Sequence, residues 1–275
     1  MPEGDTVWLA ARRLDDCLAG DVLVAADLRV PQLATVDLSG RTVESVRAYG
    51  KHLLFSVGDG LALHTHFRMD GSWHLYRHGR PWKGGPQWQV RAVLETADWQ
   101  AVGYRLPVVE ILDARGQEAL LGRLGPDILA DDVDVAEVVA RLAAAPDRAI
   151  GDALLDQAIV AGFGLIYVSE TLFLRGIPPQ APVGSIPDLA GLVTQGRDLM
   201  GANRARGAQA STGDLRAQHY VYGRAGRPCL RCGTGVKYGT QRSGRHERDA
   251  YWCPHCQPAA PPPAITAEPP GPGRV

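Results

Sequence analysis

The chain has 275 residues, 45% of them hydrophobic, and a formal net charge of −1. This length accommodates two compact units of about 100 to 150 residues and a small appendage. No apolar run approaches the roughly 20 residues that span a bilayer, and residues 1–6 are polar and acidic, unlike a secretion signal. We therefore expect a soluble, cytoplasmic, monomeric protein with no membrane partner and no nucleotide cofactor.

Residues 1–122 are expected to form an N-terminal domain with a helix followed by an antiparallel β-sandwich. Residues 5–19 place apolar side chains at the spacing of an amphipathic helix, and Gly20 follows where such a helix would end. From Val22 to about Leu121 the apolar runs shorten to strand length between turn residues, which is typical of an antiparallel sandwich or barrel. The stretch 77–87, which contains glycine and proline, is expected to be a long mobile connection.

Residues 131–175 return to helical spacing, with Gly162 and Gly164 as an interruption. A helix N-terminus beside bare glycine backbone offers N–H groups to a phosphate, and a tight packing turn explains the glycines equally well. A further helix is expected at residues 188–200. The Pro- and Ala-rich residues 258–275 are expected to be a disordered tail.

Four cysteines near the C-terminus form two Cys-x2-Cys pairs separated by 20 residues, namely Cys229, Cys232, Cys253 and Cys256. Each pair suits one side of a tetrahedral Zn²⁺. Four thiolates close the coordination shell, so we expect one structural zinc ion rather than a catalytic one. The glycine-rich residues between the pairs suit a β-hairpin.

Basic residues gather in the same part of the chain. Residues 197–256 carry 11 Lys and Arg against 4 Asp and Glu, whereas residues 1–196 carry 17 against 25. Cations beside aromatic residues on a hairpin suit a nucleic acid, although an ordinary solvated surface explains the charge equally well. On these features alone, the hairpin could belong to any zinc-ribbon module for RNA or protein partners.

The N-terminal residues suit covalent catalysis. Removal of the initiator methionine would leave Pro2 with a free secondary amine beside Glu3. An α-amino group titrates at about 7.7 to 8, so a useful fraction is an uncharged nucleophile at neutral pH. Attack on a sugar C1′ would give a cationic imine directly, and Glu3 is placed to move protons on the sugar. In isolation, the same two residues are also an ordinary polar start.

The order of the motifs resembles one family over residues 2–257. The chain has a Pro-Glu-Gly start, a helix, Gly-Lys-His-Leu-Leu at 50–54, His-Phe-Arg-Met-Asp-Gly at 66–71, glycine-hinged helices and a four-cysteine finger. This is similar to the formamidopyrimidine-DNA glycosylase and endonuclease VIII family, with the start closest to the bacterial endonuclease VIII branch. The resemblance implies an α+β multidomain fold in which residues 123–218 form a helix-two-turn-helix DNA-binding domain and residues 219–257 form a zinc finger.

The resemblance implies a bifunctional DNA glycosylase and AP lyase of base excision repair. Its partner is damaged DNA, bound in the bacterial cytoplasm at the nucleoid. The expected reaction begins with base flipping and attack by Pro2, and it ends in strand cleavage by β- and δ-elimination. Oxidised pyrimidines are the favoured lesions, while a preference for oxidised purines stays open.

The resemblance also assigns roles to single residues. It implies Pro2 as nucleophile, Glu3 as acid–base partner, and Lys51 as a lysine that reaches the active site and the DNA backbone. Arg248 matches the finger arginine that grips phosphates around the flipped nucleotide. The further DNA contacts that it implies are His66, Arg68, Met69, Gly164 and Arg245, the last as the rival of Arg248. Arg68 and Met69 lie on the loop that fills the gap left by the flipped nucleotide.

One position departs from the family pattern. Leu165 follows Gly164 where the family usually has asparagine, so a side chain that would bind phosphate is replaced by an alkyl group. The lost hydrogen bond would cost about 1.5 to 3 kcal/mol of binding free energy, although the backbone N–H groups of Gly164 and Leu165 could still bind phosphate. Val168 similarly stands where many members carry a basic residue. The alternative hypothesis is a non-catalytic or partner-dependent protein that binds lesions with the same scaffold.

Overall fold

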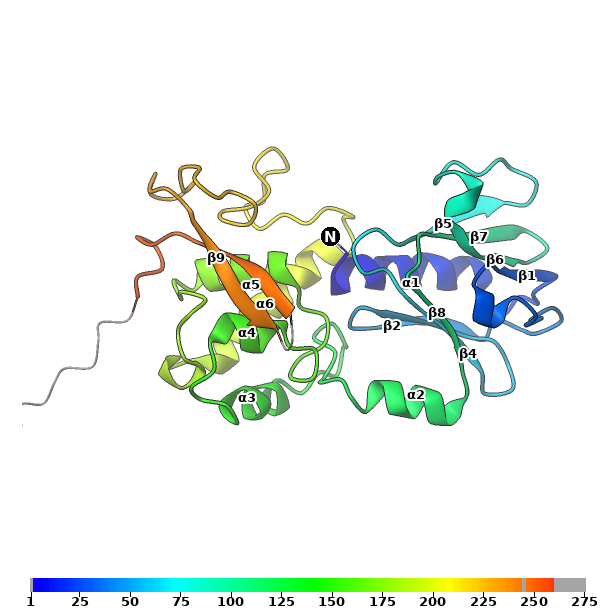
Figure 1. The fold of residues 1–275 in the computed structure, drawn as a ribbon, viewed down its shortest axis with the longest axis horizontal. Helices are drawn as coiled ribbons and strands as arrows, with labels where there is room; N and C mark the ends of the chain where they lie inside the picture. The colour runs from blue at the N-terminus through cyan, green and yellow to red at the C-terminus, as the bar shows by residue number, and fades with distance from the viewer. Residues whose placement is uncertain (1, 244–245, 260–275) are drawn as a thin grey trace, which may run out of the picture.

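The computed structural model describes residues 2–243 and 246–259. Figure 1 shows two halves that meet near the N-terminus, which lies between them. Helix α1 (Gly4–Leu18) leads from this junction into the first half. None of the helices in the described residues is long and apolar enough to cross a membrane.

Two four-stranded antiparallel sheets form the first half. One sheet has the order β1 (Ala25–Leu28), β6 (Val90–Glu95), β7 (Trp99–Tyr104) and β5 (Ser72–Arg77), and the other has the order β2 (Ser45–Tyr49), β3 (His52–Ser56), β4 (Ala62–His66) and β8 (Val108–Leu112). Because alternate residues of a strand face opposite sides, Leu53 and Phe55 point into a core that they share with Val7 and Leu14 of α1. The expected N-terminal helix and β-sandwich are confirmed.

The connection between β5 and β6 packs on the first sheet instead of standing free. Trp82 donates its Nε1–H to Oε1 of Gln100 (3.2 Å), and the N–H of Lys83 donates to the Tyr76 hydroxyl (3.0 Å). Trp82 thereby joins an apolar cluster on the face of this sheet that points away from the main core. The connection that was expected to be loose is therefore a folded cover on that face.

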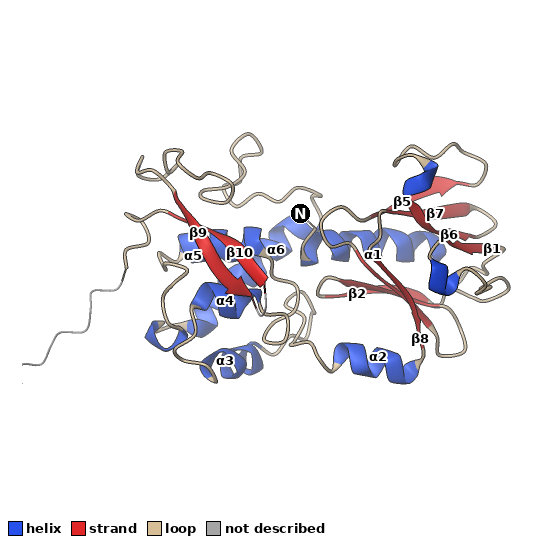
Figure 2. Ribbon diagram, in the orientation of Figure 1, coloured by secondary structure: helices blue, strands red, loops and turns tan. Residues whose placement is uncertain are grey.

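Helices dominate the second half (Figure 2). Helix α2 (Ala114–Leu121) follows β8 along the chain. The second half has a separate core, which is built by α3 (Val135–Ala143), α4 (Ile150–Leu155), α5 (Leu165–Leu174) and α6 (Leu189–Arg204). Helix α5 is buried from Leu165 to Phe173, which is typical of a helix enclosed by its neighbours. Strands β9 (Lys237–Ser243) and β10 (His246–Trp252) form an antiparallel hairpin that packs on α4 and α5.

The two halves meet backbone to backbone. The N–H of Gly4 donates to the carbonyl of Gly162 (3.0 Å), and a Cβ added at Gly4 would lie 3.1 Å from Cα of Gly162. On the other side of the junction, the Tyr49 hydroxyl donates to the carbonyl of Gly125 (3.0 Å). The start of α1 is therefore fixed against the turn that precedes α5.

Candidate active site

The Glu3 carboxylate is buried at the N-terminus of α5. Glu3 is the extended residue just before α1, so its side chain leaves the axis of that helix and reaches the other half of the molecule. The carboxylate accepts hydrogen bonds from the N–H groups of Gly164 (3.0 Å), Ile166 (2.8 Å) and Tyr167 (3.4 Å). The first N–H groups of a helix lack partners within the helix and favour a negative charge, so α5 holds Glu3 in place.

Only glycine fits at position 164, because the Glu3 side chain leaves no space for a Cβ atom. A Cβ at this position would lie 2.4 Å from Cδ of Glu3. Its N–H group, which we expected to face a phosphate, donates to Glu3 instead. In the structure, Gly164 therefore supports the carboxylate.

Burial changes the protonation of Glu3. The side chain has no exposed surface, and desolvation raises its pKa to about 7. The positive charge of Lys51 and the N–H groups of Ile166 and Tyr167 oppose this shift without cancelling it. Because a group whose pKa lies near the ambient pH can both give and take a proton, Glu3 suits general acid–base work at neutral pH.

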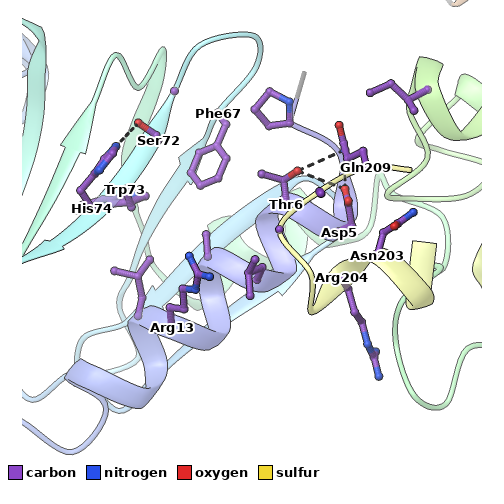
Figure 3. Close-up of a pocket in the computed structure, with 18 of the residues that line it drawn as sticks. Asp5, Thr6, Arg13, Phe67, Ser72, Trp73, His74, Asn203, Arg204 and Gln209 are labelled. Carbon is purple, nitrogen blue, oxygen red and sulfur yellow. Dashed lines mark hydrogen bonds between the residues drawn. The ribbon is translucent and has the colours of Figure 1, made fainter. Parts of the chain in front are cut away.

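Pro2 lines a cavity of about 900 Å³ between the two halves. Figure 3 shows Phe67 and Trp73 of the first half on one side of this cavity and Asn203 and Gln209 of the second half on another. Pro2 itself is partly exposed, directly beside the fully buried Glu3. A ligand in the cavity therefore contacts Pro2 and side chains from both halves.

A second buried carboxylate, Asp5, forms part of the cavity wall and was not singled out from the sequence. It accepts from the Tyr167 hydroxyl (2.7 Å). It also accepts from Nε2 of Gln209 (2.9 Å), which lies beside it in Figure 3. Burial and the Asp5 charge raise the pKa of Tyr167, which keeps its hydroxyl a donor. Asp5 thereby ties α1 both to α5 and to the segment after α6. Its partners lie more than 160 positions away along the chain, so no local pattern reveals them.

Lys51 sits at the turn between β2 and β3, beside a group of histidines. Its charge acts on Glu3, His52 and His66. Burial first, and neighbouring positive groups second, lower the pKa of His52 to about 4 and that of His66 to about 3. Both imidazoles are consequently neutral at pH 7. The Nδ1 atom of His66 accepts from the N–H of Arg68 (2.9 Å), so His66 supports the loop that follows it.

Behind Lys51, a hydrogen-bonded chain of side chains runs across three strands. Nδ1 of His52 lies 2.9 Å from Nε2 of His64, and Nδ1 of His64 lies 3.2 Å from the Glu110 carboxylate. If Glu110 accepts from His64, His64 must accept from His52, which leaves Nε2 of His52 without a proton. His64 was missed in the sequence, although its alternation with His66 on one strand indicates a shared face.

The loop between β4 and β5 exposes Met69. The N–H of Gly71 closes the turn on the carbonyl of Phe67 (2.9 Å), and Arg68 adopts a positive φ of 47°. Met69 remains 55% exposed at the tip. The guanidinium of Arg105, which the sequence did not single out, donates to the carbonyl of Asp70 (3.1 Å) and fixes this loop from the side.

Leu165 is the first residue of α5 and is 6% exposed within the helical core. Backbone groups of the turn before Leu165 form hydrogen bonds within the protein. The Gln157 side chain accepts from the N–H of Gly162 (3.0 Å) and donates to the carbonyl of Phe163 (2.9 Å). Leu165 thus serves packing, and its side chain offers no contact to a ligand. Val168 is also buried.

The four cysteines converge. The Sγ atoms of Cys229, Cys232, Cys253 and Cys256 all lie within 4.8 Å of one another. The first pair forms a tight knuckle, in which Cys229 receives the N–H of Arg231 on its sulfur (3.4 Å) and Gly233 adopts a positive φ of 78°. Four sulfur donors in one cluster fit a tetrahedral metal ion and leave no position for a substrate.

Two of the arginines expected at the DNA fall partly or wholly outside the described residues. The backbone of Arg248 belongs to β10 opposite Gln241, while its side chain lies outside the described residues. Arg245 lies entirely outside them. Residues 260–275 of the expected tail also fall outside the described part of the chain.

Comparison with known proteins identifies relatives over nearly the whole chain. A family model described as the formamidopyrimidine-DNA glycosylase N-terminal domain matches residues 1–106, and one described as the formamidopyrimidine-DNA glycosylase H2TH domain matches residues 124–194. The chain is 54% identical to the probable endonuclease 8 2 of Streptomyces coelicolor, with 94% of each chain covered. It is 44% identical to the DNA-(apurinic or apyrimidinic site) lyase Nei2 of Mycolicibacterium smegmatis, with 94% of this chain and all of that one covered.

Solved structures show the same fold. The formamidopyrimidine-DNA glycosylase of Lactococcus lactis, bound non-covalently to DNA that contains an AP site, superposes with a TM-score of 0.77. The match covers 94% of this chain and all of that chain, at 25% sequence identity.

Proposed function

Because the chain belongs to the formamidopyrimidine-DNA glycosylase and endonuclease 8 family and is a DNA glycosylase and AP lyase of base excision repair, we propose that Pro2 is its nucleophile and Glu3 its acid–base group. The observation that carries this proposal is the pairing of a partly exposed Pro2 in a large cavity with a buried Glu3 whose pKa is raised to about 7. A nucleophile and a proton carrier therefore stand side by side.

The proposed reaction begins when a flipped nucleotide enters the cavity. The nitrogen of Pro2 attacks C1′, the glycosidic bond breaks, and the base leaves with its electron pair and takes up a proton. Glu3 gives a proton to the ring oxygen as the sugar opens, and the result is an iminium ion between Pro2 and C1′. Loss of a proton from C2′ then expels the 3′ phosphate, because the iminium accepts the electron pair. A second elimination expels the 5′ phosphate, and hydrolysis of the imine frees the enzyme.

The surrounding residues have supporting roles in this scheme. We propose that Lys51 contacts the DNA phosphates next to Pro2, since its charge already acts on Glu3 and on the neutral His52 and His66. We propose that Arg248, Arg245 and the Arg68–Met69 loop also contact the DNA. Leu165 offers no such contact, so we expect the backbone and the arginines to carry phosphate binding.

The metal and the setting complete the proposal. Zn²⁺ is the ion that four thiolates suit best, and there it would hold the hairpin in shape. Oxidised pyrimidines are the proposed favoured lesions, on the Pro-Glu-Gly start alone. We propose a monomer that works without a nucleotide cofactor in the bacterial cytoplasm, at the nucleoid.

Borohydride trapping on a duplex with an abasic site tests the proposal. The protein with a free Pro2 amine is expected to give a covalent adduct, while a Pro2→Gly variant and a form that keeps Met1 are expected to give little or none. A Pro31→Gly variant, changed at an exposed proline far from the cavity, is the control and should trap normally. Absence of an adduct from zinc-loaded protein, with the free Pro2 verified by N-terminal sequencing, would overturn the lyase chemistry.

A further inference from the structure

A second hollow lies on the other side of the Met69 loop. Its volume is about 480 Å³. The residues that line it include Phe67, Arg68, Met69, Trp88, Arg91 and Arg105. Phe67 also lines the cavity of Pro2, so a single loop separates the two hollows.

Trp88 is the unusual residue of this hollow. It is 73% exposed, at the end of the connection between β5 and β6, although tryptophan is normally well buried. Met69, which is 55% exposed, lines the same hollow. Two large apolar side chains are therefore presented to solvent together on one rim.

The backbone that carries Trp88 is held firmly. Arg105 donates from its backbone N–H to the carbonyl of Gln89 (2.8 Å) and from Nη1 to Oε1 of the same residue (2.6 Å). Nη1 of Arg91 donates to the carbonyl of Trp88 (2.9 Å). Arg105 also donates to the carbonyl of Asp70. It therefore links its own loop, between β7 and β8, to the β4–β5 loop and to the β5–β6 connection. A platform fixed in this way loses little entropy when a ligand stacks on it.

The charge around the hollow suits a polyanion. Three arginines, Arg68, Arg91 and Arg105, face a single acid, Asp70. None of the ion pairs formed among the described residues includes any of these arginines. Arg91 and Arg105 donate to carbonyl and amide oxygens, which do not neutralise their positive charge. An aromatic platform ringed by cations is the arrangement that binds an unpaired nucleobase with its phosphates.

We propose that this hollow is a second nucleobase site, in which Trp88 stacks on the unpaired base of the strand opposite the damaged nucleotide. The proposal rests on the function given above, because the damaged nucleotide must occupy the Pro2 cavity. The Met69 loop lies between the Pro2 cavity and the hollow that Trp88 lines. When the damaged nucleotide of a duplex enters the Pro2 cavity, the unpaired base of the opposite strand therefore lies next to the Trp88 hollow. The structure thereby assigns recognition of the opposite strand to the β5–β6 connection.

The test uses a duplex with 2-aminopurine opposite a tetrahydrofuran abasic analogue, and the tetrahydrofuran strand alone. Stacking on Trp88 quenches 2-aminopurine, so the Trp88→Ala complex should fluoresce more brightly than the wild-type complex. The ratio of duplex Kd to single-strand Kd should rise about 5-fold or more, as expected for one lost base–aromatic stack. Trp88→Phe should restore most of the quenching, and Val24→Ala, which removes an exposed side chain elsewhere, should alter neither reading.

Equal quenching in wild type and Trp88→Ala, or an equal loss of affinity for both DNA forms, would overturn the second site. That outcome is separate from failure of the lyase chemistry, because these measurements need no imine. If wild type gave no borohydride adduct, the proposed function would fail, while the quenching comparison would still decide whether Trp88 holds the opposite base.

Discussion

At the scale of single residues, Glu3 lies in an environment very different from that of a free side chain, because it is fully buried and its pKa is raised to about 7. The Glu3 carboxylate accepts hydrogen bonds from three N–H groups with its two oxygens. A glutamine side chain has only one acceptor oxygen, and it cannot transfer a proton to or from the substrate. We expect Glu3→Gln to lower the single-turnover rate of base excision by about 10²-fold or more. The matched control is Glu44→Gln, at an exposed carboxylate, and a similar loss in both variants would contradict the assignment.

The raised pKa of Glu3 also predicts how stability depends on pH. Because the folded pKa of Glu3, about 7, lies above its ordinary value of 4.5, the stabilising contribution is fully present below pH 4.5 and is lost as the pH rises through 7. The difference corresponds to about 3 kcal/mol of unfolding free energy. Urea unfolding between pH 4.5 and 8 should show this decline in wild type and not in Glu3→Gln, and parallel curves would contradict the buried acid.

The resemblance of the Pro-Glu-Gly start to one family predicted Pro2 and Glu3 as a catalytic pair, and the two residues are adjacent in the sequence. The sequence could not predict why Glu3 is an acid near neutrality, since its hydrogen-bond donors lie at residues 164–167. The same reason hides Asp5 and the link between His64 and Glu110, whose partners lie on other strands or helices. Motif spacing identifies side chains, whereas tertiary contacts determine their protonation.

At the scale of elements, helix α5 holds the segment before the hairpin through another buried carboxylate, that of Glu170. Glu170 has no exposed surface and accepts from the N–H groups of Tyr220 (2.8 Å), Val221 (2.9 Å) and Tyr222 (2.8 Å). The hydroxyl of Ser211 donates to it as well. The N-terminus of α5 thus holds Glu3, and the middle of the same helix holds the segment that leads to the four cysteines.

Glu170→Gln is expected to lower the free energy of unfolding by about 3 kcal/mol, because the amide group would place a donor against buried N–H groups. Hydrogen exchange at the amides of residues 220–222 should also become faster. Urea unfolding and exchange mass spectrometry measure the two effects. Glu137→Gln removes an exposed carboxylate paired with Arg141, so it should cost less than about 0.5 kcal/mol. Equal losses in the two variants would refute the anchoring role of Glu170.

Among the elements, those predicted correctly are those with strong local signals. The first helix, the strand-length runs and the two cysteine pairs follow from periodicity, turn residues and spacing. The stretch 77–87 carried turn residues and was expected to be mobile, yet Trp82 anchors it to the neighbouring sheet. A single partly buried tryptophan makes this difference, and its hydrogen-bond partner Gln100 lies on β7, well beyond the stretch itself.

At the scale of the whole molecule, the proposed active site lies where the two halves touch. Pro2 and Lys51 come from the first half, while the donors that hold Glu3 come from the second. Any change that separates the halves should therefore alter the acid–base group before it alters either core. Glycines at the junction are the sensitive positions, because backbone meets backbone there with no room for side chains.

Gly50→Ala tests this coupling, with Gly60→Ala as its control. Both glycines have positive φ, 55° and 70°, so alanine costs each about 1 to 2 kcal/mol in backbone conformation. At Gly60 a new Cβ meets nothing within 4 Å, whereas at Gly50 it would lie 2.8 Å from Cβ of Ala161 and 3.0 Å from the nitrogen of Gly162. Gly50→Ala should therefore lose about 1 to 3 kcal/mol more stability than Gly60→Ala.

The more telling difference is expected in catalysis. Displacing Gly50 moves Lys51 on one side and the Gly162 turn on the other, and that turn leads directly into the donors of Glu3. Single-turnover excision should fall by about 10-fold or more in Gly50→Ala, since small displacements of positioned groups carry large kinetic costs. Gly60→Ala should retain nearly the wild-type rate. An equal loss of activity in the two variants would contradict this prediction. It would mean that the contact between the halves does not position Glu3 and Lys51.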